Sequence, residues 1–214
     1  MCGRVNVTDY QSVAILMEEI GMPVHMDADI ELSENLFPYY KPLVTGFMTD
    51  ENKMDSTLMN WGWMRKWDEG NRLFNARRVS AKGQMIWESP VWGEAIRHRR
   101  CLIPINAFYE WDQNQSKGKR DRYRIEAHEE AFTLGGIFEI SEDGELFLSI
   151  CTTDPNEKMA QIHHRMPVII DSKDAQQWLV SDDRKDVDEL MKAKPEDYIQ
   201  MTKENQVGRT ADLF

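Results

Sequence analysis

The run Arg100-Cys101-Leu102-Ile103-Pro104-Ile105-Asn106-Ala107-Phe108-Tyr109-Glu110-Trp111 is apolar along most of its length and ends in an aromatic group that encloses one carboxylate. The run predicts an extended segment over residues 101–111. A carboxylate in such surroundings is either paired or raised in pKa, and a raised Glu110 can exchange protons near neutral pH. The alternative is a Glu110 on an edge strand, facing water.

Further extended segments are expected on both sides of this run, mostly separated by polar or glycine-containing turns. Helices are expected at residues 8–20, after Ser89-Pro90 and in the C-terminal part of the chain. The combination predicts an α+β fold, with mainly antiparallel strands curled into a barrel-like core, peripheral helices, and one domain over residues 1–214. The expected strands are 42–49, 56–64, 122–127, 131–139, 145–153 and 166–170, and the later helices are 172–180 and 184–193.

The first helix carries a start signal and a stop signal. Thr8 and Gln11 form a capping-box pattern, and Gly21 with Pro23 indicates the end. Apolar residues between them recur on one helical face. These signals together predict a helix over residues 8–20.

Cysteine usage and apolar patterning limit the class of protein. The three cysteines, Cys2, Cys101 and Cys151, form no CxxC pair and suggest no disulfide framework. We expect no metal site and no cofactor, because no clustered His and Cys spacing is present. No apolar run has the length that spans a bilayer, and no apolar signal segment opens the chain. A reducing, cytoplasmic location is expected.

Charge is distributed unevenly along the 214 residues. The net charge of −11 argues against a nucleic-acid partner at first. Residues 61–125, however, hold 14 Lys and Arg against 7 Asp and Glu, together with six of the seven tryptophans. Basic residues interleaved with aromatic ones suit a single nucleic-acid strand. The alternative is that the tryptophans fill the core and the arginines form a solvated face.

Cys2 would become the first residue if Met1 were removed, which is usual before a small residue. The chain would then begin with an amine and a thiol on one residue, both partly nucleophilic at neutral pH. Such a pair can take up an aldehyde as a Schiff base and close it to a thiazolidine ring. Alone, a cysteine at this position is more often an inert small hydrophobe.

Two polar motifs indicate little about function when each is taken by itself. The triplet Asn75-Ala76-Arg77 is read equally well as a turn with a solvated arginine. The pair His163-His164 offers an acid–base or hydrogen-bonding group, but a paired-histidine motif is more often structural or exposed.

Together, the motifs are more specific than any one of them. In this order they resemble the SOS response-associated peptidase (SRAP) family, whose members form covalent crosslinks with abasic sites in DNA, and the resemblance spans roughly residues 1–170. The motifs are MCGR at residues 1–4, WGW at 61–63, NAR at 75–77, RRCLIP at 99–104, FYEW at 108–111 and HHRMP at 163–167.

The resemblance implies roles for four residues in catalysis. Cys2 matches the cysteine that links to the ring-opened sugar of an abasic site, and Asn75 matches the asparagine that positions its amine. Glu110 matches an acidic residue that transfers protons during ring opening and imine chemistry. His163 matches the histidine beside the Schiff base, whereas His164 fills a variable position and is left out of the site.

The resemblance also implies a single-stranded DNA partner containing abasic sites and a role in the DNA damage response. Arg4 and Arg77 match arginines that hold phosphates flanking the lesion. Trp61 and Trp67 match an aromatic region at the DNA-binding face. Autoprocessing of Met1 and lyase-like Schiff-base chemistry are the enzymatic activities expected.

Two alternatives stay open at the level of sequence. Cys2 could serve as the N-terminal nucleophile of a thiol-dependent peptidase. The chain could also bind single-stranded DNA without covalent chemistry, in which case loss of Arg77 would weaken binding and loss of Cys2 would not.

Overall fold

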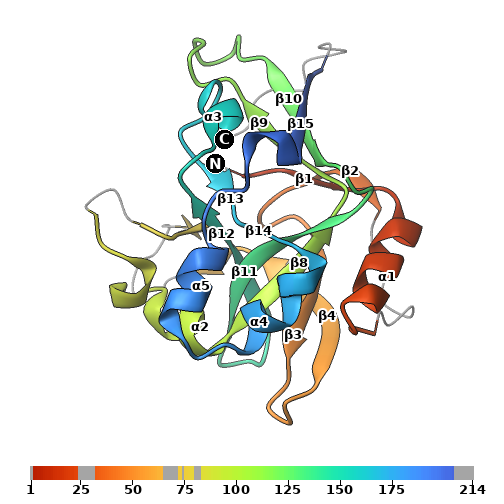
Figure 1. Ribbon diagram of the computed structural model, residues 1–214, viewed down its shortest axis with the longest axis vertical. Coiled ribbons are helices and arrows are strands. Elements are labelled where there is room, and N and C mark those ends of the chain that lie inside the picture. Colours follow the sequence, from red (N-terminus) through yellow and green to blue (C-terminus); the bar gives the residue numbers. More distant parts are fainter. Residues whose placement is uncertain (1, 24–31, 65–71, 74, 80–82, 205–214) are drawn as a thin grey trace.

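The computed structural model describes residues 2–23, 32–64, 72–73, 75–79 and 83–204. Its centre is a closed ring of five strands, in which each strand pairs with two others (Figure 1). Every pairing in the ring is antiparallel except β12 with β4, where Phe147 lies opposite Asn60. The predicted α+β fold with a barrel-like core is therefore confirmed. In ring order the strands are β12 (Leu146–Thr153), β4 (Met54–Trp61), β3 (Pro42–Met48), β8 (Arg100–Ile105) and β11 (Phe132–Ile140).

A second, antiparallel sheet holds the N-terminal strand in its interior. Its order places β1 between β9 and β2. The strands, in order across the sheet, are β15 (Ile199–Lys203), β10 (Arg122–Ala127), β9 (Ala107–Trp111), β1 (Val5–Val7) and β2 (Ser33–Leu36).

Short strands extend the barrel and bring two site motifs to β12. The strand β7 (Asn75–Arg77) pairs with β12 in parallel, and β13 (Met166–Pro167) pairs with it antiparallel. Both the Asn75 motif and the His163 motif are thereby fixed to one strand of the barrel. The remaining short strands are β14 (Ile169–Ile170), β5 (Trp63–Met64) and β6 (Arg72–Leu73).

Helices lie around the barrel, with α2, α4 and α5 grouped at one end and α1 on another side (Figure 1). The predicted C-terminal helices are confirmed, although the first begins as a 3-10 turn. The α-helices are α1 (Tyr10–Glu19), α2 (Gly93–His98), α3 (Glu157–Ala160), α4 (Ala175–Val180) and α5 (Arg184–Leu190); the 3-10 turns are η1 (Ile86–Glu88), η2 (Ser172–Asp174) and η3 (Glu196–Tyr198).

The start of the first helix differs from the prediction. Asp9, not Thr8, is the N-cap, and its carboxylate accepts hydrogen bonds from the amides of Gln11 and Ser12 at 3.0 and 3.2 Å. The Thr8 hydroxyl instead donates to Asn6 Oδ1 at 2.8 Å. A carboxylate also suits the positive end of the helix dipole better than a hydroxyl.

The predicted extended run at 101–111 is two strands in two different sheets. Asn106 lies at the break, and its side chain holds the turn to α1. Its Oδ1 accepts from the amides of Thr8 and Asp9, both at 3.0 Å, and its Nδ2 donates to Ser12 Oγ and to the carbonyl of Glu130. The chain therefore passes from barrel to outer sheet at one anchored residue.

Arg100 connects two helices from inside the protein. It is only 4% exposed and begins β8. Its guanidinium satisfies the last carbonyls of α2 and α4, which have no partner within their own helices. The carbonyls that accept from it are those of Ile96, Arg97, Trp178, Leu179 and Ser181.

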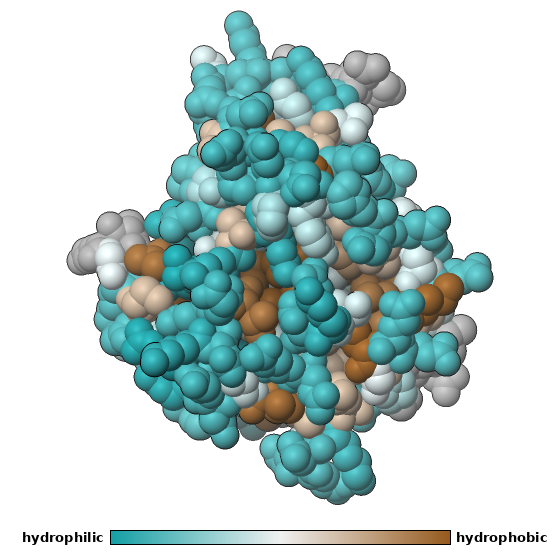
Figure 2. All heavy atoms as spheres, in the orientation of Figure 1, coloured by the Kyte–Doolittle hydropathy of each residue, from teal (hydrophilic) through white to brown (hydrophobic). Residues whose placement is uncertain are grey.

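The outer surface is mostly hydrophilic on the face shown in Figure 2, with apolar side chains in a few separate patches. Within the described residues, no helix is long and apolar enough to cross a membrane. The prediction of a single domain over residues 1–214 stays a prediction.

Candidate active site

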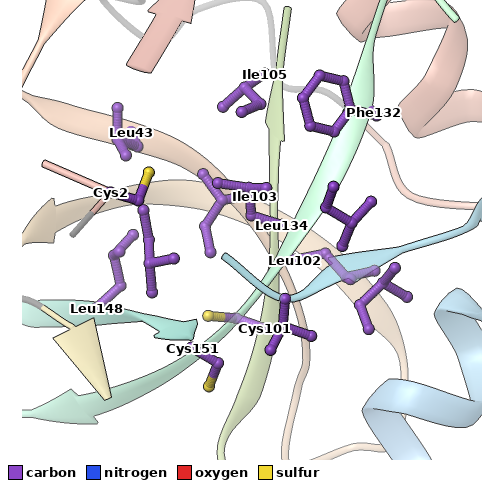
Figure 3. Close-up of a cluster of buried hydrophobic side chains, with 14 of the residues drawn as sticks. Cys2, Leu43, Cys101, Leu102, Ile103, Ile105, Phe132, Leu134, Leu148 and Cys151 are labelled. Atoms are coloured by element: carbon purple, nitrogen blue, oxygen red, sulfur yellow. The ribbon is translucent and has the colours of Figure 1, made fainter. Parts of the chain in front are cut away.

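Cys2 lies in the interior, three residues before the strand β1, which belongs to the outer sheet. The residue is 1% exposed and belongs to the main apolar cluster, beside Leu43 and Leu148 of the barrel (Figure 3). Burial raises the pKa of its thiol well above the ordinary range, and the charge of Glu110 raises it further. The thiol is therefore protonated at neutral pH.

Asn75 touches the backbone of Cys2 directly. Its Nδ2 donates to the Cys2 carbonyl at 2.8 Å, and its position is fixed because β7 pairs with Ile150 and its neighbours on β12. The other end of the amide, Oδ1, is buried and has no hydrogen-bond partner within the described part of the chain. A buried acceptor without a donor is costly, so this oxygen is suited to receive an incoming N–H group.

Glu110 lies in the middle of the outer sheet, where β9 pairs with both β10 and β1. The alternative of an edge residue facing water is therefore wrong: Glu110 is 2% exposed. Burial raises its pKa from the ordinary 4.5 to about 7, although the positive charge of Arg165 acts in the opposite direction. The carboxyl group can thus take up or release a proton near neutral pH.

His163 faces Glu110, with 3.7 Å between Nε2 and Oε2. Burial lowers the pKa of the imidazole to about 3, and its Nδ1–H donates to the Arg165 carbonyl at 3.0 Å. Because the imidazole is neutral, it forms no ion pair with the carboxyl group, and 3.7 Å exceeds a hydrogen-bond distance. His163 is therefore a neutral hydrogen-bonding group at physiological pH, and it carries no acidic imidazolium proton.

Sequence reasoning missed Gln113, which joins the two histidines. The Gln113 Nε2 atom lies 2.5 Å from His163 Nε2, and the Gln113 Oε1 atom lies 2.7 Å from His164 Nδ1. The two imidazole rings stack at 4.7 Å. A glutamine three residues after Glu110 carries no motif signal, so only the folded structure reveals the contact.

A basic cavity of about 230 Å³ opens next to these groups. Arg165 is 8% exposed, donates to the Thr152 hydroxyl, and has a buried Nε without a hydrogen-bond partner among the described residues. Burial and the nearby charge of Arg77 lower the Arg165 pKa to about 10, so the guanidinium stays charged. The cavity is lined by Arg77, Val79, Thr152, Thr153, Asp154, His164 and Arg165.

The residues predicted for DNA binding differ in their location and in their burial. Arg77 lines the basic cavity, and Arg4 is half-buried two residues after Cys2. Trp61 is 1% exposed, because it ends a barrel strand and packs in the core, so its ring offers no open face. The prediction for Trp67 falls outside the described residues. Core packing also accounts for Trp63.

The fold and the site define a class of protein: a barrel-centred α+β protein that gathers a thiol, a carboxyl group of raised pKa and a neutral imidazole around its N-terminal segment. The family described as "SOS response associated peptidase (SRAP)" matches residues 1–209. The chain therefore belongs to this family.

Several relatives carry names that describe their action on DNA. The Abasic site processing protein YoaM of Bacillus subtilis is 32% identical over 185 residues, covering 84% of this chain and 79% of its own length. YedK of Escherichia coli, with the same description, is 25% identical over the same shares. HMCES of Gallus gallus is 28% identical over 56% of this chain and 44% of its own length.

Solved structures share the fold. A crystal structure of a protein from Bacteroides thetaiotaomicron superposes with a TM-score of 0.74 at 20% identity, covering 94% of this chain and 91% of that one. A phage-related protein from Bordetella bronchiseptica gives 0.73 at 19% identity, covering 96% and 95%.

Proposed function

We propose that this protein captures abasic sites in single-stranded DNA by forming a covalent bond through Cys2 after Met1 has been removed. Family membership and the names of the relatives support abasic-site DNA as the target. The observation that carries the chemistry is the contact of Asn75 with Cys2. One end of the amide holds the Cys2 carbonyl, and the other is a buried acceptor beside the residue whose amine would react.

The reaction balances without a further reactant. The ring-opened deoxyribose presents an aldehyde at C1′, and the neutral Cys2 amine adds to it to form a carbinolamine. Loss of one water gives an imine, and the Cys2 sulfur then adds to the imine carbon while its proton passes to nitrogen. The product is a thiazolidine, and only one water has left.

Glu110 is suited to the proton transfers in these steps. Loss of water needs an acid, and later steps need a base. A carboxyl group with a pKa of about 7 is present in both forms near neutral pH. His163, with its pKa lowered to about 3, contributes a hydrogen bond to the sugar or carbinolamine and no proton.

The basic cavity gives the strand its position. Arg77 and Arg165 line it, and phosphates flanking the lesion would supply the negative charge that these guanidinium groups attract. The same cations favour the neutral, nucleophilic form of a nearby amine. A single strand fits the buried Cys2 better than a duplex, because exposing C1′ in a duplex costs unstacking energy.

The test uses the full chain, with Met1 removal established by intact mass, and an oligonucleotide containing one abasic site. We expect a denaturation-resistant adduct with the mass of protein plus DNA less one water, and none with Cys2→Ala. Both Cys2→Ala and Cys2→Ser keep the α-amine and lose the sulfur, so either variant can form the reversible imine but not the thiazolidine ring. Absence of an adduct with processed, folded protein would overturn the proposal, and peptide hydrolysis would become the leading activity.

A further inference from the structure

A stack of alternating cations and aromatic rings begins next to the site. The Arg4 guanidinium lies between two rings, 5.6 Å from the centroid of Trp111 and 5.0 Å from that of Phe37. Phe37 stacks on Tyr40 with centroids 4.5 Å apart and ring planes 11° from parallel. The Lys41 ammonium lies 5.9 Å from the Tyr40 ring and completes the series. We call these five residues the ring stack.

The ring stack is joined to the site by the backbone. Arg4 is two residues from Cys2, so their Cα atoms are within roughly 7 Å of one another. Trp111 directly follows Glu110, and the Tyr109 amide donates to the Arg4 carbonyl at 2.9 Å. The stack therefore starts at the site and ends at Tyr40 and Lys41, which are exposed.

Among the residues that the structure describes, Tyr40 is the exposed member of the large aromatic residues. Its side chain is 48% exposed, whereas Trp61, Trp63 and Trp87 are nearly fully buried. The ring is already oriented by its contact with Phe37, so little conformational freedom remains to be lost when something stacks on it. A flat, preoriented, exposed ring among cations is suited to a nucleotide base beside its phosphates.

We propose that the ring stack is a subsite for a base of the same strand that flanks the abasic site. The base stacks on Tyr40, and the flexible Lys41 side chain moves from the ring to the adjoining phosphate. Arg4, held by Asn35 Oδ1 at 3.4 Å, keeps Phe37 and thereby Tyr40 in place. This inference rests on the proposed function, because it takes a DNA strand as the occupant of the site.

The test measures binding without covalent chemistry. Fluorescence anisotropy is recorded with an oligonucleotide that carries a tetrahydrofuran in place of the abasic sugar, which has no aldehyde. We expect Tyr40→Ala to weaken binding at least about fivefold, because one base stack is lost, and Tyr40→Phe to bind as the parent does. Ile140→Ala is the matched control, since Ile140 is also exposed, at 59%, and lies at the far end of β11.

A second measurement locates the base. A 2-aminopurine placed in turn at each position flanking the tetrahydrofuran is expected to lose fluorescence on binding at one position, and this loss is expected to disappear in Tyr40→Ala. Removing the base at that position should make the parent and Tyr40→Ala bind equally. Lys41→Gln should lower the salt dependence of log Kd by about 0.7.

The two proposals fail in different ways. The affinities of Tyr40→Ala and the parent could agree within twofold for every oligonucleotide while the aldehyde-containing DNA still forms its adduct. In that case the ring stack only holds β2 in place, and the inference is wrong. If no adduct forms but Tyr40→Ala still weakens strand binding, the covalent function is wrong and the subsite stands.

Discussion

Replacing Glu110 by glutamine should make the protein more stable above neutral pH and less reactive at the same time. The carboxyl group is 2% exposed, and burial raises its pKa from 4.5 to about 7. The folded state therefore holds this proton more tightly than the unfolded state. The stabilisation is fully present below about pH 4.5 and is lost as the pH rises through about 7.

The magnitude follows from the size of that change. A rise from 4.5 to about 7 corresponds to about 3 kcal/mol of unfolding free energy. Glu110→Gln does not titrate, so its stability should exceed that of the parent by about 3 kcal/mol more at high pH than at low pH. Urea unfolding at about pH 4 and about pH 8 measures this difference directly.

Two comparisons make the prediction specific. Glu145→Gln removes an exposed carboxylate in the turn before β12 and should follow the parent curve. The rate of adduct formation in Glu110→Gln should fall by about 100-fold or more, because the acid–base group is lost. Parallel stability curves for the parent and Glu110→Gln would refute the assignment of a buried, proton-exchanging carboxyl group.

Three further predictions concern single contacts. Asn75→Ala removes the donor to the Cys2 carbonyl and should slow adduct formation about tenfold or more. Affinity for the tetrahydrofuran oligonucleotide should stay unchanged. Adduct formation at the rate of the parent would exclude a positioning role for Asn75. Arg100→Lys leaves buried helix-end carbonyls without donors, so urea unfolding should show a loss of about 3 kcal/mol, and a loss under about 0.5 would contradict this account. Gly62→Ala would place a Cβ 2.1 Å from Tyr39 Cε1, at a residue whose backbone φ is 148°. Thermal unfolding should show a destabilisation of about 1–3 kcal/mol. An unchanged Tm would show that the Tyr39 ring can move away at little cost.

Strand pattern and helix signals in the sequence were sufficient for the fold class, because local propensity and apolar pattern agree with the final structure over most elements. They did not predict the features that depend on a contact with another residue, such as the strand break at Asn106 and the N-cap of the first helix. Asn106 divides the run 101–111 only because its side chain reaches Ser12 and the carbonyl of Glu130. Thr8 and Asp9 are both acceptable caps by type, and the contact of Thr8 with Asn6 excludes it from that role.

The site was predictable to the extent that motifs mark it. Cys2, Asn75, Glu110 and His163 were named from their motifs, and the structure brings Asn75 to Cys2 and His163 to Glu110. Gln113 lies outside every motif, since a side-chain amide has no spacing rule that predicts two imidazole partners. Its contacts depend on a loop between β9 and β10 meeting the segment before β13.

Because the parallel pairing of β12 with β4 closes the barrel, we expect the site to assemble late in folding. Strands as distant in sequence as β4 and β12 pay a loop-closure entropy before their pairing stabilises anything, so such contacts form slowly. Asn75 depends on the same strand β12 for its position. A chain in which β12 is not yet paired therefore lacks the contact between the Asn75 amide and the Cys2 carbonyl, and we expect this contact to form together with the barrel.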